Sequence, residues 1–185
     1  GGLTAYRAVR HGLDILHNVG ERGRALVIGA GGLGQYAISY LRMMSDAQVI
    51  ALDLAEDKRG QAIQIGAHDA VGPDADIEPC DVVIDFIGAD VTLATAAANV
   101  ARKGTVIVVG LAGGTTPFGL TVVAPEARFM SSFWGTRTEM DDLLALVRRE
   151  PSIIRPVEAL PLADAQTAHD RLRRGQFTSR LVLLP

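Results

Sequence analysis

A glycine-rich segment at residues 29–34 has residue types and a spacing suited to binding phosphates. It reads Gly29-Ala30-Gly31-Gly32-Leu33-Gly34, a G-x-G-x-x-G pattern between an apolar run and a helical pattern. In this context Gly29 allows a tight turn, Gly31 lets the backbone approach a pyrophosphate, and Gly34 lets the following helix pack closely on the preceding strand. The helix N-terminus offers unpaired N–H groups and the positive end of its dipole to the phosphates. The segment therefore predicts a dinucleotide-binding loop.

An acidic residue further along the chain supports this interpretation. Asp53 ends the next apolar run, residues 48–53, about 20 residues after Gly34. A carboxylate there can accept hydrogen bonds from both hydroxyls of the adenosine ribose and would repel a 2′-phosphate, so the pattern favours NAD over NADP. The alternative is a glycine-rich turn with a solvent-facing Asp53, in an α/β fold that binds no dinucleotide.

The elements around these residues alternate between apolar runs and helical patterns. Near-continuous apolar runs are typical of strands buried on both faces, and helices between them are typical of crossovers in a parallel sheet. The expected strands are 24–28, 48–53, a short one near Val71, 81–87 and 105–109, and the expected helices are 33–44, 56–65 with Gly66 as its C-terminal cap, and 90–102 with Asp90 as N-cap. This order predicts a parallel sheet with helices on both faces.

The rhythm changes after Ala112, where a turn-rich loop begins. The remaining patterns predict strands at 120–123 and 128–134, a helix at 138–149 with Thr138 as N-cap, an extended connector at 151–161, a helix at 163–173 and a strand at 180–184.

Composition limits the class of protein. The chain has 185 residues, 48% of them hydrophobic, and a formal net charge of −3. These values argue against disorder and against binding to nucleic acid or an anionic membrane surface. The single cysteine, Cys80, has no partner for an internal disulfide, and no run of about 18 apolar residues predicts a membrane span. Without a signal-like N-terminus or an initiating Met, the sequence is expected to be a cytoplasmic piece of a longer chain.

Several motifs, in their order and spacing, make the chain resemble the zinc-dependent alcohol dehydrogenase family, the medium-chain dehydrogenases/reductases, over essentially its whole length. They are Gly2-Leu3-Thr4-Ala5-Tyr6, the loop at 29–34, Ala51-Leu52-Asp53 with Lys58, Ile65-Gly66-Ala67, Asp85-Phe86-Ile87-Gly88, Val109-Gly110-Leu111, Phe133-Trp134-Gly135-Thr136-Arg137 and Ser179-Arg180-Leu181-Val182.

The resemblance implies a doubly wound α/β (Rossmann) fold with six parallel strands in the order 3-2-1-4-5-6. Residues 1–185 are expected to form a single NAD-binding domain, without the family's N-terminal barrel-like catalytic domain. The segments 1–22 and 151–185 are expected to pack against that missing domain.

The resemblance also implies roles for residues beyond the loop. Lys58 would reach the adenosine ribose, Arg180 would neutralise the pyrophosphate, and Thr4 would lie near the nicotinamide. The strand-end residues would line the path from adenine to nicotinamide. The expected cofactor-binding set is Thr4, Gly29, Gly31, Gly32, Leu33, Gly34, Asp53, Lys58, Ile87, Gly88, Val109, Gly110, Leu111 and Arg180. The alternatives are a solvated Lys58, an Arg180 paired with a surface carboxylate, and ordinary strand-end glycines.

No catalytic residue or metal ligand is expected in this chain. The resemblance implies that zinc is bound in the longer parent protein, on the absent domain, with one ligand immediately ahead of Gly1. The remaining candidates, His11, His17, His68, His169 and Cys80, show no ligand spacing. Cys80 is expected to be a structural thiol and His68 to face solvent.

The resulting expectation is an NAD-dependent alcohol dehydrogenase, in which hydride transfer between an alcohol and NAD gives an aldehyde or ketone, while this chain alone is inactive. The alternatives are a zinc-free quinone or enoyl reductase of the same superfamily and a non-catalytic nucleotide-sensing module. The resemblance further implies a homodimer or homotetramer, joined through the apolar strand 128–134. The alternative is that the helix at 138–149 covers this strand and the segment 120–123 within the chain.

Overall fold

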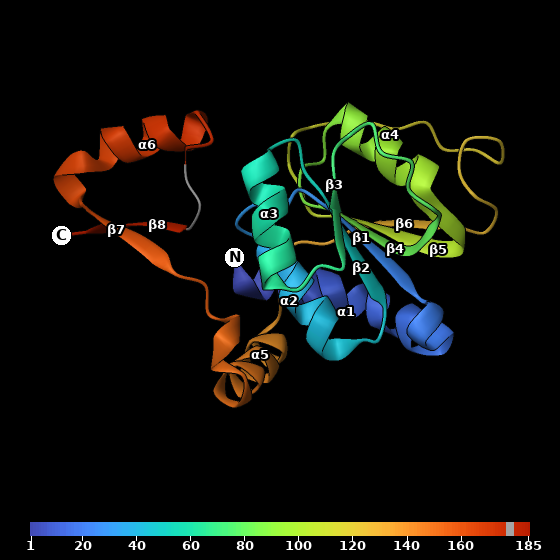
Figure 1. Cartoon of the computed structure of the whole chain (residues 1–185), viewed down its shortest axis with the longest axis horizontal. Helices are drawn as coiled ribbons and strands as arrows, with labels where there is room; N and C mark the ends of the chain where they lie inside the picture. The colour runs from blue at the N-terminus through green and yellow to red at the C-terminus, as the bar shows by residue number, and fades with distance from the viewer. Residues whose placement is uncertain (177–179) are drawn as a thin grey trace.

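The chain forms a six-stranded parallel sheet with helices on both faces. The computed structural model describes residues 1–176 and 180–185 (Figure 1). The sheet has the order β3-β2-β1-β4-β5-β6, which confirms the predicted topology. Its strands are β1 (Arg24–Ile28), β2 (Gln48–Leu52), β3 (Asp69–Val71), β4 (Cys80–Asp85), β5 (Val100–Val108) and β6 (Arg128–Ser131). The surrounding helices are α1 (Gly2–Val19), α2 (Gly34–Met44), α3 (Glu56–Ile65), α4 (Asp90–Asn99) and α5 (Arg137–Arg149), and a short 3-10 turn (Gly20–Arg22) joins α1 to β1.

Side chains that alternate along each strand build two cores, one on each face of the sheet. In β1, Ala25 and Val27 join a cluster that includes buried residues of α1, α2 and α5. The intervening Leu26 and Ile28 join a second cluster with Ala96 of α4. Because both faces are covered, every residue of β1 after Arg24 is buried, which explains the continuous apolar run in the sequence.

Helix α1 lies before the first apolar run, where no element is predicted from the sequence. Its buried residues recur at helical spacing and include Ala5, Val9, Leu13 and Leu16. The helix packs against α2, β4 and α5. Most of segment 1–22 therefore belongs to the core of this domain, while its contact with a further domain stays a prediction.

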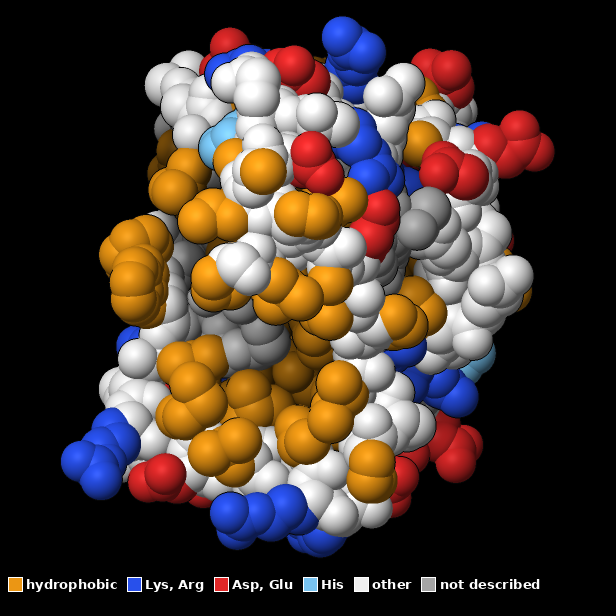
Figure 2. Space-filling view, turned by 90° about the vertical axis from the view of Figure 1, so that its left-hand side faces the viewer, with side chains coloured by type: hydrophobic (Ala, Val, Ile, Leu, Met, Phe, Trp, Pro, Cys, Tyr) orange, Lys and Arg blue, Asp and Glu red, His pale blue; other side chains and the backbone are white. Residues whose placement is uncertain are grey.

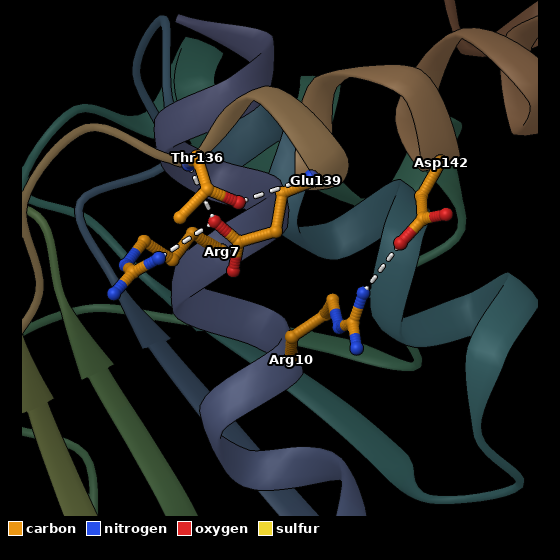
Figure 3. Close-up of polar contacts among 5 residues, drawn as sticks. All are labelled: Arg7, Arg10, Thr136, Glu139 and Asp142. Atoms are coloured by element: carbon orange, nitrogen blue, oxygen red, sulfur yellow. Dashed lines mark hydrogen bonds and ion pairs between the residues drawn. The ribbon is translucent and has the colours of Figure 1, made fainter.

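The N-cap of helix α5 is Thr136, two residues before the predicted Thr138, and the helix begins at Arg137. The Thr136 hydroxyl accepts a hydrogen bond from the Glu139 N–H, and the Glu139 carboxylate accepts one from the Thr136 N–H. Figure 3 shows that Glu139 also pairs with Arg7 of α1, with 2.6 Å between Nη1 and Oε2. A second pair, Arg10 with Asp142, joins the same two helices one turn further along. These contacts fix α5 on α1.

The segments between α4 and the end of β6 differ from the prediction at several points. Residues 120–123 form a turn, with Leu120 93% exposed, so the strand predicted there is wrong. β5 begins at Val100, where α4 has already ended, and β6 stops at Ser131. Asp90 is the first residue of α4 and not its N-cap, and its carboxylate accepts a hydrogen bond from the Thr115 N–H.

The C-terminal segment forms a separate two-stranded unit. A 3-10 turn (Pro151–Ile153) and β7 (Val157–Pro161) replace the predicted extended connector. β7 pairs in parallel with β8 (Arg180–Leu184), and a second 3-10 turn (Leu162–Asp164) and α6 (Ala165–Arg173) lie between them. Both oxygens of Glu158 accept hydrogen bonds from Arg171, so β7 and α6 are joined.

This C-terminal unit projects from the main sheet (Figure 1) and leaves apolar side chains uncovered. Ile154, Val157, Leu162 and Leu184 are each more than half exposed. Figure 2 views the molecule from this side, and hydrophobic side chains gather in the middle of the face. No helix among residues 1–176 and 180–185 is long and apolar enough to cross a membrane.

Candidate cofactor-binding site

The turn between β1 and α2 is shaped by two glycines that have no room for a side chain. Gly29 has a φ of 88°, in the left-handed region, and its N–H donates to the Leu52 carbonyl. A Cβ on Gly34 would lie 1.9 Å from the Gly29 carbonyl oxygen. The first turn of α2 therefore presses directly against the end of β1, as the sequence pattern predicts.

The two glycines between them, Gly31 and Gly32, face open space. A Cβ on either residue would have no heavy atom within 4 Å, so these glycines are not needed for packing. They lie just before α2, and the N-cap residue Leu33 makes no side-chain capping bond. The result is a cradle of backbone at a helix N-terminus, a fitting site for the phosphates of a dinucleotide.

Asp53 lies directly beside this cradle. Its side chain is buried, and Oδ2 accepts a hydrogen bond from the Ala30 N–H at 2.9 Å. Oδ1 accepts another from the Ala55 N–H at 3.0 Å. Each carboxylate oxygen keeps a further lone pair for a ribose hydroxyl. The alternative of a solvent-facing Asp53 is therefore wrong, because this carboxylate links the end of β2 to the glycine loop.

The turns after β4 and β5 contact each other at the same carboxyl end of the sheet. A Cβ on Gly88, which has a φ of 71°, would lie 2.3 Å from the Gly110 carbonyl oxygen. A Cβ on Gly110 would lie 2.0 Å from the Ile87 carbonyl carbon. These glycines are thus required for close approach of two backbones. Around them, Ile87 and Leu111 are exposed by 43% and 82%, whereas Val109 is buried.

A fully buried carboxylate, Asp85, organises both of these turns and was not among the residues predicted for the site. Its Oδ1 accepts hydrogen bonds from the Ile87 and Gly88 N–H groups. Its backbone carbonyl accepts two more, from Val109 and Gly110. The signal in the sequence is an acidic residue within an otherwise apolar strand, since a buried carboxylate needs such partners.

The other predicted residues lie on three separate elements. Lys58 is partly exposed on α3, and Thr4 is partly exposed on α1. Arg180 begins β8 with its guanidinium beside Gly1, where a Cβ on Gly1 would lie 2.7 Å from Nη1. Ser179, part of the same motif, lies outside the described residues. The structure thus brings the glycine loop, Asp53 and the two strand-end turns together at the carboxyl end of the sheet. The roles of Lys58, Thr4 and Arg180 stay predictions.

The histidines and the cysteine form no metal site within the described residues, where no three His, Cys, Asp or Glu side chains come together. Cys80 is buried, and burial raises the pKa of its thiol to about 11, so it stays protonated at neutral pH. His68 is exposed, but its Nδ1 accepts a hydrogen bond from the Val49 N–H. Desolvation and the nearby Arg42 lower the pKa of His68.

Together, the doubly wound sheet and the glycine turn at the carboxyl end of β1 define a domain of the dinucleotide-binding class. The chain belongs to the zinc-binding dehydrogenase family, whose model matches residues 32–149.

Individual relatives match nearly the whole chain. An NAD-dependent alcohol dehydrogenase of Sulfolobus acidocaldarius is 31% identical over 98% of this chain and 55% of its own length. Among solved structures, the alcohol dehydrogenase of Aeropyrum pernix has a TM-score of 0.85 at 29% identity, covering 100% of this chain and 55% of that one. The acetophenone reductase of Geotrichum candidum, in complex with NAD, has a TM-score of 0.86 at 30% identity, covering 99% and 53%. The chain thus spans about half the length of the relatives it matches.

Proposed function

We propose that this chain binds NAD(H) as the cofactor-binding part of an alcohol dehydrogenase. The observation that carries the proposal is the open backbone cradle at Gly31 and Gly32, with the Asp53 carboxylate fixed beside it by the Ala30 N–H. The names of the relatives agree with it, since one is an NAD-dependent alcohol dehydrogenase and another was solved with NAD.

In this proposal the chain holds and orients the cofactor. The N-terminus of α2 would bind the pyrophosphate and Asp53 the adenosine ribose, with Lys58 and Arg180 supplying positive charge near the ribose and the pyrophosphate. The exposed side chains of Ile87 and Leu111 would offer apolar surface toward the nicotinamide half, near Thr4, while the turn that begins at Val109 would contribute its backbone. Bound NAD supplies the hydride acceptor for oxidation of a small alcohol to an aldehyde or ketone.

We further propose that the substrate pocket and any zinc site belong to a part of the protein outside this chain. The uncovered apolar side chains of the C-terminal unit, such as Val157 and Leu184, support a packing partner for segment 151–185. On its own the chain should show little or no dehydrogenase activity. We also propose a cytoplasmic location, in keeping with the single reduced thiol of Cys80.

Calorimetric titration of the chain with NAD tests the proposal directly. One binding site per chain is expected, and no detectable binding of NAD or NADH would contradict it. Assays of the full-length protein, together with metal analysis, then separate the alternatives. Alcohol oxidation with bound zinc supports the dehydrogenase, metal-free quinone or enoyl reduction would indicate the reductase, and tight NAD binding without turnover would indicate a sensor.

Cofactor choice is expected to depend on Asp53. Asp53→Ala should weaken NAD binding about tenfold, since a charged hydrogen-bond acceptor is lost, and should narrow the preference for NAD over NADP. NADP should gain little affinity, because Asp53→Ala also removes the hydrogen bonds from the Ala30 and Ala55 N–H groups, which hold the glycine loop and the Asp53 turn together. Dissociation constants for both cofactors measure the effect, with Asp53→Asn as the isosteric control. Equal affinity for NAD and NADP in the unmutated chain would contradict the prediction.

We also propose that the chain dimerises through the open edge of β6. This strand pairs with β5 on one side, and the aromatic residues that follow it, Phe133 and Trp134, are 64% and 67% exposed. An uncovered edge with apolar neighbours favours pairing with a second copy. Assembly into a tetramer would need a further interface.

Ser131→Pro is expected to convert the dimer to a monomer. The Ser132 N–H donates to the Val108 carbonyl, so the N–H of the preceding residue points away from β5, toward the open edge. Proline removes that donor without breaking the β5–β6 ladder. Met130 is a poorer choice because its side chain packs against a buried core cluster. Light scattering measures the result, and a monomeric unmutated chain at micromolar concentration would rule out the edge dimer.

A further inference from the structure

A second charged residue contacts the turn that presents Asp53. Arg59, in the first half of α3, donates from Nη1 to the carbonyl oxygens of Asp53 at 2.9 Å and of Leu54 at 2.8 Å. Its own backbone N–H donates to the Ala55 carbonyl, in the first turn of the helix. Arg59 therefore links α3 to the backbone of the Asp53–Leu54 turn, which carries the carboxylate proposed to bind the ribose.

The Leu54 side chain adds little packing to this turn, because it is 79% exposed. The turn is held by hydrogen bonds instead. The Asp53 carboxylate accepts from Ala30 and Ala55, the Asp53 N–H donates to the Val71 carbonyl at 3.2 Å, and Arg59 binds the two carbonyls. Because Arg59 donates to two successive carbonyls of the turn, it helps to set the backbone direction from which the carboxylate projects.

We propose that Arg59 is a positioning residue for cofactor selection: it holds the Asp53–Leu54 turn so that the Asp53 carboxylate faces the adenosine ribose and excludes a 2′-phosphate. The inference rests on the proposed NAD-binding function and adds to it a residue on α3 that acts through Asp53. It does not make Arg59 a ligand of the cofactor, because its guanidinium is engaged with the two carbonyls.

Loss of Arg59 should change the preference for NAD over NADP in one direction if Arg59 positions Asp53, and in the other if it acts through its charge alone. If Arg59 acted by attracting phosphate, its loss would weaken NADP, with its extra phosphate, more than NAD, and the preference for NAD would grow. If Arg59 positions Asp53, its loss weakens NAD more than NADP, and the preference shrinks. The ratio of the two dissociation constants therefore distinguishes the two roles, and a general loss of stability would change both constants alike.

The test compares Arg59→Met, Arg59→Lys and the control Arg102→Met in this chain. Arg102 makes an exposed ion pair with Glu126 near the amino end of β5, whereas the candidate site lies at the carboxyl ends of the strands. Its replacement therefore removes the same charge far from the Asp53–Leu54 turn. We expect Arg59→Met to weaken NAD about fivefold to tenfold and to lower the NADP-to-NAD ratio of dissociation constants at least threefold, on the order of one lost hydrogen-bonding group. Arg59→Lys, which keeps the charge and one donor nitrogen, should restore part of the ratio, and Arg102→Met should leave it unchanged.

Thermal unfolding of each variant shows whether the binding data refer to folded chain, and Arg59→Lys serves as the reporter if Arg59→Met does not fold. An unchanged or increased ratio in the folded variant would overturn the proposal while leaving NAD binding intact. Failure of the unmutated chain to bind NAD would instead overturn the proposed function, so the two failures are distinguishable.

Discussion

Gly31→Val is expected to abolish NAD binding while leaving the chain folded. In the structure a Cβ at Gly31 meets no heavy atom within 4 Å, so a side chain can start there without a clash in the free protein. That open space lies just before the N-terminus of α2, where a pyrophosphate must approach the backbone. The side chain would occupy the phosphate site, and affinity for NAD should fall at least about a hundredfold, a loss of roughly 3 kcal/mol.

Calorimetry with NAD measures this loss, and circular dichroism with thermal unfolding shows whether the fold persists. Gly60→Val is the matched control, because a Cβ at Gly60 also faces open space, on the surface of α3. It should bind NAD as the unmutated chain does. Undiminished NAD binding by Gly31→Val would show that the phosphates bind elsewhere.

The sheet and its strand order could be predicted because parallel strands covered on both faces leave a strong pattern. β1 and β2 are uninterrupted apolar runs, each followed by a helix that ends near a glycine or a polar residue. The tight turn at Gly29 and the close packing at Gly34 could also be predicted, because each demands glycine at a particular spacing.

Elements defined by one amphipathic face, or by no covering layer, were harder to predict. α1 buries a stripe of small and apolar residues, but its N-cap residue Gly1 makes no side-chain capping bond and its first turn holds no acidic residue. The predicted strand at 120–123 has an apolar run, but the segment forms a turn in which Leu120 is 93% exposed. The start of α5 is marked in the sequence by the capping box of Thr136 and Glu139, which the prediction of Thr138 as N-cap did not use.

The parts of the site that sequence reasoning missed act on backbone groups. The Asp85 carboxylate accepts hydrogen bonds from N–H groups of the turn after β4, and the Asp85 carbonyl accepts them from the turn after β5. Arg59 donates to two carbonyls. Any residue can supply a backbone N–H or carbonyl, so no motif marks the partner. Only the unexpected charge, in a buried strand or beside the Asp53–Leu54 turn, indicates such a role.

Gly34→Ala is expected to have the opposite profile from Gly31→Val, because it should destabilise the fold itself. Its Cβ would lie 1.9 Å from the carbonyl oxygen and 3.0 Å from the carbonyl carbon of Gly29, and neither backbone atom can move without shifting β1 away from α2. Overpacking of this kind costs about 3 kcal/mol or more, which for a domain of this size lowers the melting temperature by roughly 10 °C.

Thermal unfolding of Gly34→Ala beside Gly31→Ala measures the contrast, since the two variants add the same methyl group three residues apart in one loop. Gly31→Ala should melt within about 2 °C of the unmutated chain, because its methyl group faces open space. If Gly34→Ala melts as high as Gly31→Ala, α2 does not need its close contact with β1. The loop would then serve phosphate access alone, and the division of its glycines into packing and access positions would be wrong.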